Sequence, residues 1–261
     1  MGLTLSAEEW RVVMENDSYP WHKPPRRNIG DLWNSELYEG ADWSKLDNPK
    51  VRSTARSLPT KAVLWPEAKR IHKRNIAAGN RSYHVNAFIH CCTDDQNFDG
   101  EREGIWKRWK FFYEVASHFD GILCVDFSTN ADFPEPVKRH QFHKMRAIEH
   151  GAIRRGIATI PNARWGTKET WGYCFDALPE NDVLSVGIVG SGYGNLENRP
   201  MFDAGMRKLV ELKRPKALVV IGSTNYPIFD EVRDAGVEVF QIDGTTCTYF
   251  KSKGADDVQA R

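Results

Sequence analysis

Residues 121–128 read GILCVDFS and residues 157–166 read IATIPNARWG. Between them, a polar loop leads into a helical pattern over residues 137–155. Both apolar runs are short, rich in Ile, Val and Leu, and do not alternate with polar residues, which is typical of strands buried on both faces of a parallel sheet. Pro136 suits the first turn of the helix, and Gly156 suits its C-terminal end. This stretch therefore predicts a strand, helix and strand of an α/β fold.

The same alternation continues on both sides of this unit. Apolar runs predict further strands at residues 62–65, 83–89, 183–189, 217–221 and 237–242. Helical spacing predicts helices at residues 105–118, 168–178, 201–212 and 226–235. Up to seven mostly parallel strands that alternate with helices fit a barrel-like (β/α) arrangement, a fold of about 250 residues. An open, doubly wound sheet is the alternative, although no Gly-x-Gly-x-x-Gly follows the first strand.

Composition divides the chain into three parts. Residues 1–60 contain many Pro, Asn, Asp and Ser residues but also several Trp. Because disordered segments are poor in aromatic residues, we expect an irregular Trp-rich arm packed on the body of the protein. Residues 61–250 are expected to form a single α/β domain. Residues 251–261 are polar and are expected to be a frayed tail.

The bulk composition excludes several classes of protein. The net charge of +1 provides no global attraction to nucleic acid or membrane. No apolar run approaches 18 residues, and the first residues do not resemble a secretory signal, so we expect no membrane partner. Five cysteines without a Cys-x-x-Cys pair indicate a reduced, cytoplasmic protein. The cofactor and the oligomeric state are not specified by these features.

Polar residues follow the predicted strands, where the loops of a parallel sheet meet at one edge. A carboxylate kept ionised by an arginine can act as a base or nucleophile, and a guanidinium can bind a phosphate or carboxylate in a fork. The candidate catalytic residues are Asp126, Ser128, Asn162 and Asp243. The alternative is a structural ion pair between Asp126 and Arg164, with Asn162 and Ser128 capping helices.

Other residues at the same edge are candidates for binding the substrate. A glycine-rich turn over residues 190–195 would let backbone N–H groups approach an anion, but it lacks the Lys-Ser/Thr ending of a P-loop. A flexible connection is the alternative. The candidate substrate-binding residues are Arg164, Trp165, Arg146, Gly190, Ser191, Arg199, Ser223 and Asn225.

Histidines and basic residues elsewhere admit simpler interpretations. His143 and His150 are two helical turns apart, about 10 Å, so one metal ion cannot bind both, and we predict no metal site. The Lys and Arg residues of the same helix predict a solvated basic face. Residues 69–74 and 107–110 are basic with aromatic neighbours, which suits nucleic acid, although solvated helix faces explain them equally simply. His90-Cys91-Cys92 could form a nucleophile pair, but neighbouring strand residues point to opposite faces.

Residues 121–223 resemble DUF4417, an uncharacterised domain family found in bacteria, phages and other mobile elements. The matching residues are Asp126-Phe-Ser128, Asp132-Phe-Pro134, Arg146, Gly156, Ile160-Pro161-Asn162-x-Arg164-Trp165, Phe175, Pro179, Gly190, Arg199, Phe202, Gly205, Pro215 and Gly222. The resemblance implies a phage or prophage origin, and hence the cytoplasm of a host cell. It brings no established activity. Since Arg146 belongs to the match, we expect Arg146 to support the site from the helix.

Two classes of function remain. The first is an enzyme that acts on a nucleotide, a nucleic acid or another phosphate or sugar substrate by hydrolysis or group transfer, with Asp126 as base or nucleophile and Arg164 as anion clamp. The second is a binding protein that grips a nucleic acid, a signalling nucleotide or a host protein without catalysis.

Overall fold

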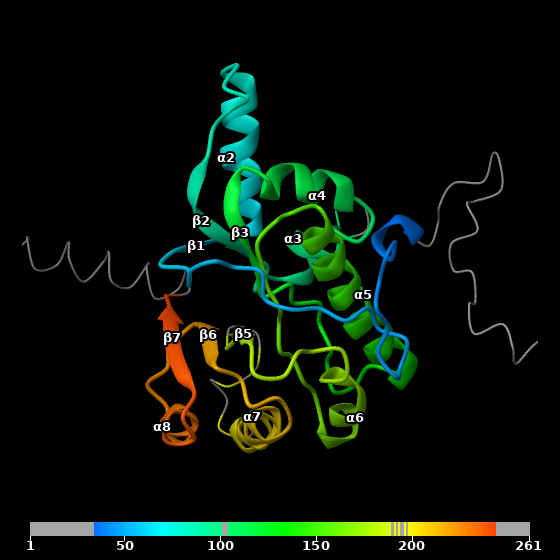
Figure 1. Ribbon diagram of the computed structural model, residues 1–261, viewed down its shortest axis with the longest axis vertical. Coiled ribbons are helices and arrows are strands. Elements are labelled where there is room, and N and C mark those ends of the chain that lie inside the picture. The colour runs from blue at the N-terminus through cyan, green and yellow to red at the C-terminus, as the bar shows by residue number, and fades with distance from the viewer. Residues whose placement is uncertain are drawn as a thin grey trace, which may run out of the picture.

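The computed structural model describes residues 34–100, 104–188, 191, 193, 196 and 198–243 (Figure 1). Over these residues, seven parallel strands form two sheets, each in chain order. The first sheet consists of β1 (Ala62–Leu64), β2 (Val85–His90), β3 (Phe119–Leu123) and β4 (Thr159–Ile160). The second consists of β5 (Val183–Gly187), β6 (Ala217–Ile221) and β7 (Glu238–Ile242). The prediction of an α/β fold with parallel strands is therefore confirmed.

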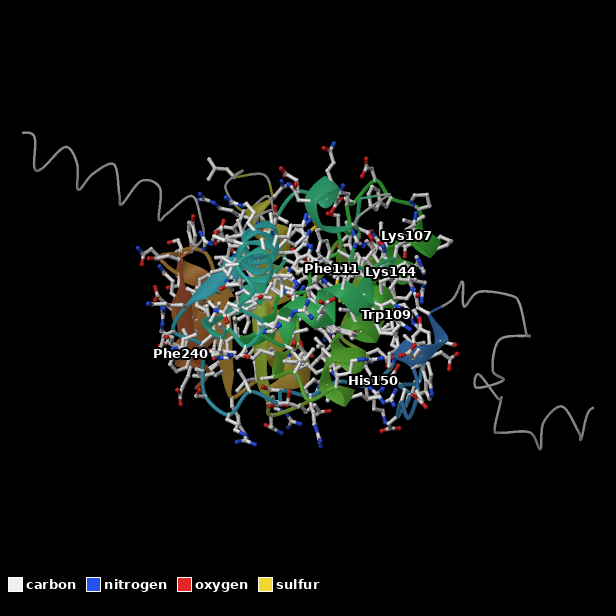
Figure 2. All side chains as sticks on the ribbon, turned by 90° about the horizontal axis from the view of Figure 1, so that it is seen from above. Lys107, Trp109, Phe111, Lys144, His150 and Phe240 are labelled. Atoms are coloured by element: carbon white, nitrogen blue, oxygen red, sulfur yellow. The ribbon has the colours of Figure 1, made fainter. Side chains whose placement is uncertain are left out.

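Helices connect the strands, as the alternating pattern predicted. The α-helices are α2 (Trp65–Ala77), α3 (Asp95–Phe98), α4 (Trp109–Ala116), α5 (Glu135–Arg154), α6 (Trp171–Cys174), α7 (Arg199–Lys213) and α8 (Pro227–Asp234). Two short 3-10 helices are η1 (Ser35–Leu37) and η2 (Lys168–Thr170). Viewed from above, Phe240 of β7 lies on the opposite side of the molecule from Trp109 and His150 (Figure 2). Within the described part of the chain, no helix combines the length and the apolar character needed to span a membrane.

Within the residues that the structure describes, one isolated bridge joins the two sheets. Asn162, just after β4, pairs with Ser185 of β5 in parallel orientation. The Ser185 N–H donates to the carbonyl of Pro161 at 2.8 Å, and the Ser185 carbonyl accepts from Ala163 at 2.7 Å. The side-chain hydroxyl of Ser185 also accepts a hydrogen bond from the backbone N–H of Cys124 at 2.9 Å. All seven strands consequently follow one another in space in the order of the chain.

Apolar side chains from both sheets share one inner cluster. Its buried members are Phe88, Cys92, Leu123, Cys124, Ile160, Val219, Ile221 and Ile242. A larger core lies between the strands and the helices and includes Ile89, Ile122, Leu184, Val186, Leu218 and Val220. Strands β4, β5 and β6 are thus buried on both faces, as the lack of alternation predicted, whereas β7 exposes Glu238 and Gln241. Among the described residues no pairing joins β7 to β1, so a closed barrel is not shown.

Residues 51–58 cover the start of the strands between the two sheets. The Thr54 N–H donates to the carbonyl of Thr159, the first residue of β4, at 2.9 Å. The Thr159 N–H donates in turn to the hydroxyl oxygen of Thr54 at 3.0 Å. Ala55 and Leu58 pack on the inner cluster. This part of the predicted arm is therefore packed on the body. The predicted arm residues 1–33 lie outside the described residues, as does the predicted tail.

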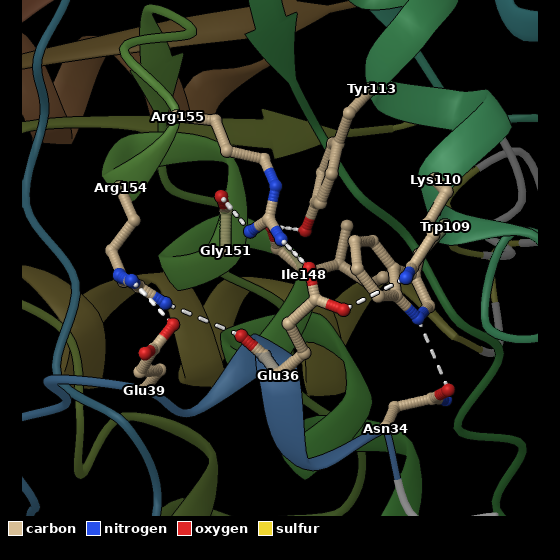
Figure 3. A network of polar contacts seen from close by, with 10 residues as sticks. All are labelled: Asn34, Glu36, Glu39, Trp109, Lys110, Tyr113, Ile148, Gly151, Arg154 and Arg155. Carbon is tan, nitrogen blue, oxygen red and sulfur yellow. Dashed lines mark hydrogen bonds and ion pairs between the residues drawn. The ribbon is translucent and has the colours of Figure 1, made fainter. Parts of the chain in front are cut away.

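Charged side chains hold η1 against α4 and α5 (Figure 3). The carboxylate of Glu36 bridges Lys110, at 2.8 Å, and Arg155, at 2.9 Å. Beside them, Arg154 pairs with Glu39 at 2.7 Å. The segment that precedes the first strand is thus connected to two helices that follow it by 70 residues or more.

The long helix α5 is central rather than peripheral. It begins at Glu135, with Pro136 in its first turn, and is followed by Gly156 at φ 73°, so both predicted boundary residues take their expected places. The prediction of a solvated basic face is wrong for Lys138 and Lys144, which are buried. Arg146, which we expected to support the site from the helix, is buried as well. Each of these cations is paired with a nearby carboxylate, and this attraction offsets the free-energy cost of removing the charge from water.

Candidate functional site

Three of the predicted site residues lie together at the carboxyl end of the strands. Asp126 follows β3, and Asn162 and Arg164 follow β4. Arg164 Nη1 donates to Asp126 Oδ2 at 2.7 Å. Asn162 Nδ2 donates to Asp126 Oδ1 at 3.2 Å and to the carbonyl of Val125 at 3.2 Å. One carboxylate therefore has a cation on one oxygen and an amide on the other. The alternative role of Asn162 as a helix cap is wrong, since its side chain binds Asp126.

The backbone just before Asp126 has an unusual conformation. Cys124 directly follows β3 and has φ 46°, in the left-handed region that residues other than glycine rarely adopt. The hydrogen bond from its N–H to Ser185 Oγ helps to hold this conformation. Strain of this kind costs about 1–3 kcal/mol and persists only where surrounding contacts enforce it. The chain thus leaves the regular strand geometry two residues before the candidate catalytic carboxylate.

A buried ion pair on α5 holds Asn162 from behind. Glu149 Oε1 accepts a hydrogen bond from the Asn162 N–H at 2.6 Å, and Arg146 donates to the Asn162 carbonyl. Arg146 and Glu149 lie 3.1 Å apart and are almost completely buried. The expectation that Arg146 supports the site from the helix agrees with this contact. Glu149 was missed, although its position three residues after Arg146 is the spacing of a helical ion pair.

Burial dominates the titration of these acids. Removal from water raises the pKa of Asp126, while Arg164 and the hydrogen bond from Asn162 lower it and the nearby Asp95 raises it further. Burial raises the pKa of Glu149 to about 7, against the opposing effect of Arg146 and the Asn162 N–H. A carboxyl group whose pKa is raised toward neutrality can exchange a proton in general acid or base catalysis.

A small pocket of about 40 Å³ opens beside Arg164. Its walls are the loop after β4, the end of β5 and the first turn of α7, and its lining residues are Ala163, Arg164, Trp165, Gly166, Val186, Gly187, Ser191, Asn198, Met201 and Phe202. A Cβ atom at Gly187 would lie 2.7 Å from Cys92 Sγ and 3.7 Å from Asp126 Oδ2. Glycine at this position therefore allows the pocket wall to approach the carboxylate closely.

Arg164 connects the carboxylate with the pocket. Its side chain is 14% exposed, against 7% for Asp126. Within the described residues, the side chain of Arg164 makes one hydrogen bond, from Nη1 to Asp126. Its Nε and Nη2 groups therefore have no hydrogen-bond partner there. A guanidinium has five N–H donors in a fixed fork. The pocket is consequently lined by a cation with unused donors and by the N-terminal turn of a helix, both of which favour an anion.

A family model described as a domain of unknown function, DUF4417, matches residues 43–241. The chain belongs to the DUF4417 family. The family match extends on both sides of residues 121–223, which carried the resemblance in the sequence, and includes all seven strands except the last residue of β7.

Two phage proteins are similar to this DUF4417 chain. The Gene 1 protein of Mycobacterium phage D29 is 25% identical over 158 residues, which cover 58% of this chain and 57% of that protein. The Gene 1 protein of Mycobacterium phage L5 is 23% identical over 183 residues, covering 70% of this chain and 74% of that protein. The chain thus spans less than two thirds of the D29 relative. No solved structure matches significantly.

Trp165 is one of the residues that line the pocket in this DUF4417 protein. Its ring stacks at a tilt on Phe202 of α7, with ring centroids 5.0 Å apart, and lies against Gly205 one turn further on. A Cβ at Gly205 would come within 2.2 Å of the indole ring. Glycine at this position is therefore required for the close approach of Trp165 to the helix. Gly205 also belongs to the residues that carried the resemblance to the family.

The remaining candidates have other partners. Ser128 donates to Asp95 at 2.7 Å, and Arg199 donates through Nε to the Tyr193 carbonyl at 3.0 Å. Ser223 accepts from the Asn225 N–H at 3.2 Å in the loop after β6. Asp243, after β7, accepts from Gln241 at 2.9 Å. Ser191 lines the pocket with Arg164. Gly190 lies outside the described residues.

The histidines of α5 act separately. His143 lies 2.9 Å from the Tyr38 hydroxyl and 3.2 Å from Asn48 Oδ1, whereas His140 packs edge-on against Trp106. His150 points toward the Glu39 carbonyl at 3.5 Å. In the described part of the chain, no group of three or more His, Cys, Asp or Glu residues is arranged to hold a metal ion.

Cys91 and Cys92 do not resemble a nucleophile pair with His90. Both thiols are buried, and burial raises their pKa well above the ordinary value. Since the thiolate is the nucleophile, a raised pKa makes these cysteines unreactive near neutral pH. Burial also lowers the pKa of His90 to about 4, so the ring is neutral at pH 7.

Proposed function

We propose that this DUF4417 protein is an enzyme that acts on a small phosphate-bearing substrate, such as a nucleotide or sugar phosphate, by hydrolysis or group transfer. The observation that carries the proposal is the contact between Arg164 and Asp126 at the edge of the pocket. It joins an anion-binding group to a buried acid. The two groups have the chemistry of substrate binding and of proton transfer, respectively.

The size of the pocket supports recognition of one phosphate group. A volume of about 40 Å³ holds a few water molecules, which is comparable to the space of a phosphate and much smaller than a nucleobase. Arg164 lines this space, and its Nε and Nη2 groups have no hydrogen-bond partner among the described residues. The first turn of α7 carries no acidic residue that would repel an anion. The rest of the substrate would then lie outside the pocket.

Substrate binding would change the proton affinity of Asp126. Arg164 is the main group that lowers the pKa of this carboxyl against burial. An anion bound to the same guanidinium offsets part of that effect, which raises the pKa of Asp126 further. The carboxyl then holds a proton that it can donate to a leaving group. In this scheme Asn162 orients the carboxylate, and the ion pair of Arg146 and Glu149 orients Asn162.

We also infer that the seven strands form an open barrel. Their single order in space and the inner cluster shared by both sheets support this inference. The carboxyl ends of barrel strands are where enzymes of that architecture place their active sites. The position of Asp126 and Arg164 at that end is consistent with the proposed activity.

Two conservative variants test the function. Arg164→Lys keeps the charge but loses the fork, and Asp126→Asn keeps the size but loses the ionisable proton. With inorganic phosphate as the probe, we expect a rise in the melting temperature of the wild type and of Asp126→Asn, and a smaller rise for Arg164→Lys. Arg214→Lys, at an exposed ion pair with Glu180, is the matched control.

Turnover separates catalysis from binding. A panel of nucleotides and sugar phosphates followed by phosphorus NMR should reveal conversion by the wild type that Asp126→Asn abolishes. Binding without conversion of any phosphate compound would favour the alternative, a non-catalytic binding protein. If Asp126→Asn retains full turnover, or phosphate fails to stabilise the wild type, the proposal is wrong.

A further inference from the structure

We infer that the outer face of α2 binds the phosphate backbone of double-stranded DNA. Figure 1 shows α2 projecting from the top of the molecule, with the loop that leads into β2 at its tip. Arg70, Lys73 and Arg74 are exposed at the i, i+3 and i+4 positions of this helix, so they share one face. Arg81, also exposed, lies in the loop that follows. The projection therefore presents four cations to solvent.

The charge is concentrated in this segment. Residues 65–84 contain five Lys or Arg residues and one acid, Glu67, a net charge of +4, whereas the whole chain has +1. Glu67 pairs with Arg70. In the described part of the chain, Lys73, Arg74 and Arg81 form neither an ion pair nor a side-chain hydrogen bond. Acids of other elements approach the histidines of this segment, with Glu114 of α4 at 3.7 Å from His72 and Asp120 of β3 at 2.9 Å from His84. In the part of the chain that the structure describes, Lys73, Arg74 and Arg81 thus remain without a counterion.

Packing and helix stability do not account for these residues. The buried face of α2 is formed by Trp65, Ala68 and His72, and the cations lie away from it. Arg70 and Arg74 are one turn apart, and like charges at this spacing destabilise a helix by about 0.2–0.5 kcal/mol. The negative end of the helix dipole offsets this cost only for cations in the last turn. A polyanion outside the protein would relieve the repulsion at all of these positions.

The position of the basic face separates it from the Asp126 site. Because α2 begins directly after β1 and its loop leads into Val85 at the start of β2, the tip of α2 lies at the amino end of the strands. Asp126 and Arg164 lie at the carboxyl end. The basic face therefore does not deliver a substrate to the pocket, and its DNA binding is a function independent of the proposed enzyme.

The shape of the surface favours duplex DNA over other polyanions. Single-strand binding relies on exposed aromatic rings that stack with bases, but Trp65 is only 1% exposed and Tyr83 8%. A membrane-binding helix has a broad apolar face toward the lipid, whereas Ile76 is the one large apolar side chain of α2 counted as exposed. A 13-residue helix is about 20 Å long, and a helix of this kind fits the major groove with its cations against phosphates.

The test measures binding to a labelled 20-base-pair duplex by fluorescence anisotropy at 50–200 mM salt. Each phosphate contact contributes about −0.9 to the slope of log affinity against log salt. For wild type we expect a slope of about −3 or steeper. Lys73→Gln/Arg74→Gln/Arg81→Gln should reduce the slope by about 2 to 3, whereas Lys45→Gln/Lys168→Gln/Lys216→Gln, which removes the same charge from exposed positions elsewhere, should change it little.

Circular dichroism and the phosphate-dependent rise in melting temperature serve as further readouts. Both should be unchanged in the α2 variant, because glutamine is a good helix former and the pocket lies at the other end of the strands. The inference is overturned if wild type shows no salt-dependent binding at 50 mM salt, or if both triple variants lose affinity equally. Tighter binding to a single strand of the same length, or to phosphatidylserine vesicles, would also overturn it.

Discussion

Glu149 of α5 accepts a 2.6 Å hydrogen bond from the backbone N–H of Asn162, thirteen residues further along the chain. Its ion-pair partner Arg146 binds the carbonyl of the same residue. Both backbone groups of Asn162 are therefore held by one buried ion pair, while its side chain touches Asp126. The candidate site is thus fixed from the side that faces the protein core, and its other side is open to the pocket.

Neutralising Glu149 should destabilise the protein strongly. Glu149→Gln can still accept the hydrogen bond from Asn162, but it leaves the charge of Arg146 buried without a counterion. We expect a loss of about 3–5 kcal/mol in the free energy of unfolding, measured by urea denaturation at about pH 9, where the Glu149 carboxyl with its pKa of about 7 is ionised. Arg146→Met/Glu149→Leu removes both charges and should restore part of this loss. A loss below 1 kcal/mol in Glu149→Gln would show that the pair contributes little to the fold.

Two glycine-to-alanine substitutions should differ in their effect on stability. Gly205→Ala places a Cβ within 2.2 Å of the Trp165 ring, so the ring or α7 must move, and we expect a loss of about 1–3 kcal/mol in stability. Because Trp165 lines the pocket, the stabilisation by phosphate should fall as well. Gly172→Ala in α6, where nothing lies within 4 Å, is the control and should be neutral or stabilising. Equal effects of the two substitutions would contradict the packing argument.

Acid should weaken the attachment of residues 38–48 to α5 through His143. Burial lowers the pKa of His143 to about 4, below the value of about 6.5 in an unfolded chain. Between these values the unfolded state binds more protons, so stability rises with pH from 4 to 6.5 and is lost as the pH falls. The difference in unfolding free energy between wild type and His143→Gln should therefore increase over this range. If the difference does not depend on pH, protonation of His143 is not the cause of the pH-dependent stability.

The carboxylate of Glu36 should contribute only modestly to stability. It bridges Lys110 and Arg155, but about half of its side chain is exposed to solvent. Double-mutant cycles of exposed ion pairs give about 0.2–1 kcal/mol. We expect a coupling in this range between Glu36→Gln and Arg155→Gln, and a decrease of the coupling at 1 M salt. A coupling above 2 kcal/mol would mean that the pair is shielded from water.

Local sequence patterns predicted the order of the elements and much of the site. The strands could be found because burial on both faces requires continuous Val, Ile and Leu, and Pro136 and Gly156 marked the ends of α5. Asp126, Asn162 and Arg164 were found for a related reason, since loops after parallel strands meet at one edge. The long helix expected at residues 105–118 was predicted too long, because α4 begins at Trp109 after a turn.

Contacts between distant segments decided the rest. Lys138 and Lys144 of α5 suggested a solvated face, but both are buried beside a carboxylate, and Lys144 pairs with Asp99, 45 residues away. Glu149 could not be assigned to the site, because nothing in its neighbourhood along the chain shows that it faces the loop after β4. The α/β fold and the meeting of Asp126, Asn162 and Arg164 at one edge therefore follow from the sequence alone, since periodicity and burial are local properties. The pairing of Lys144 with Asp99 and the contact of Glu149 with Asn162 follow only from tertiary packing, which determines which groups lose water together.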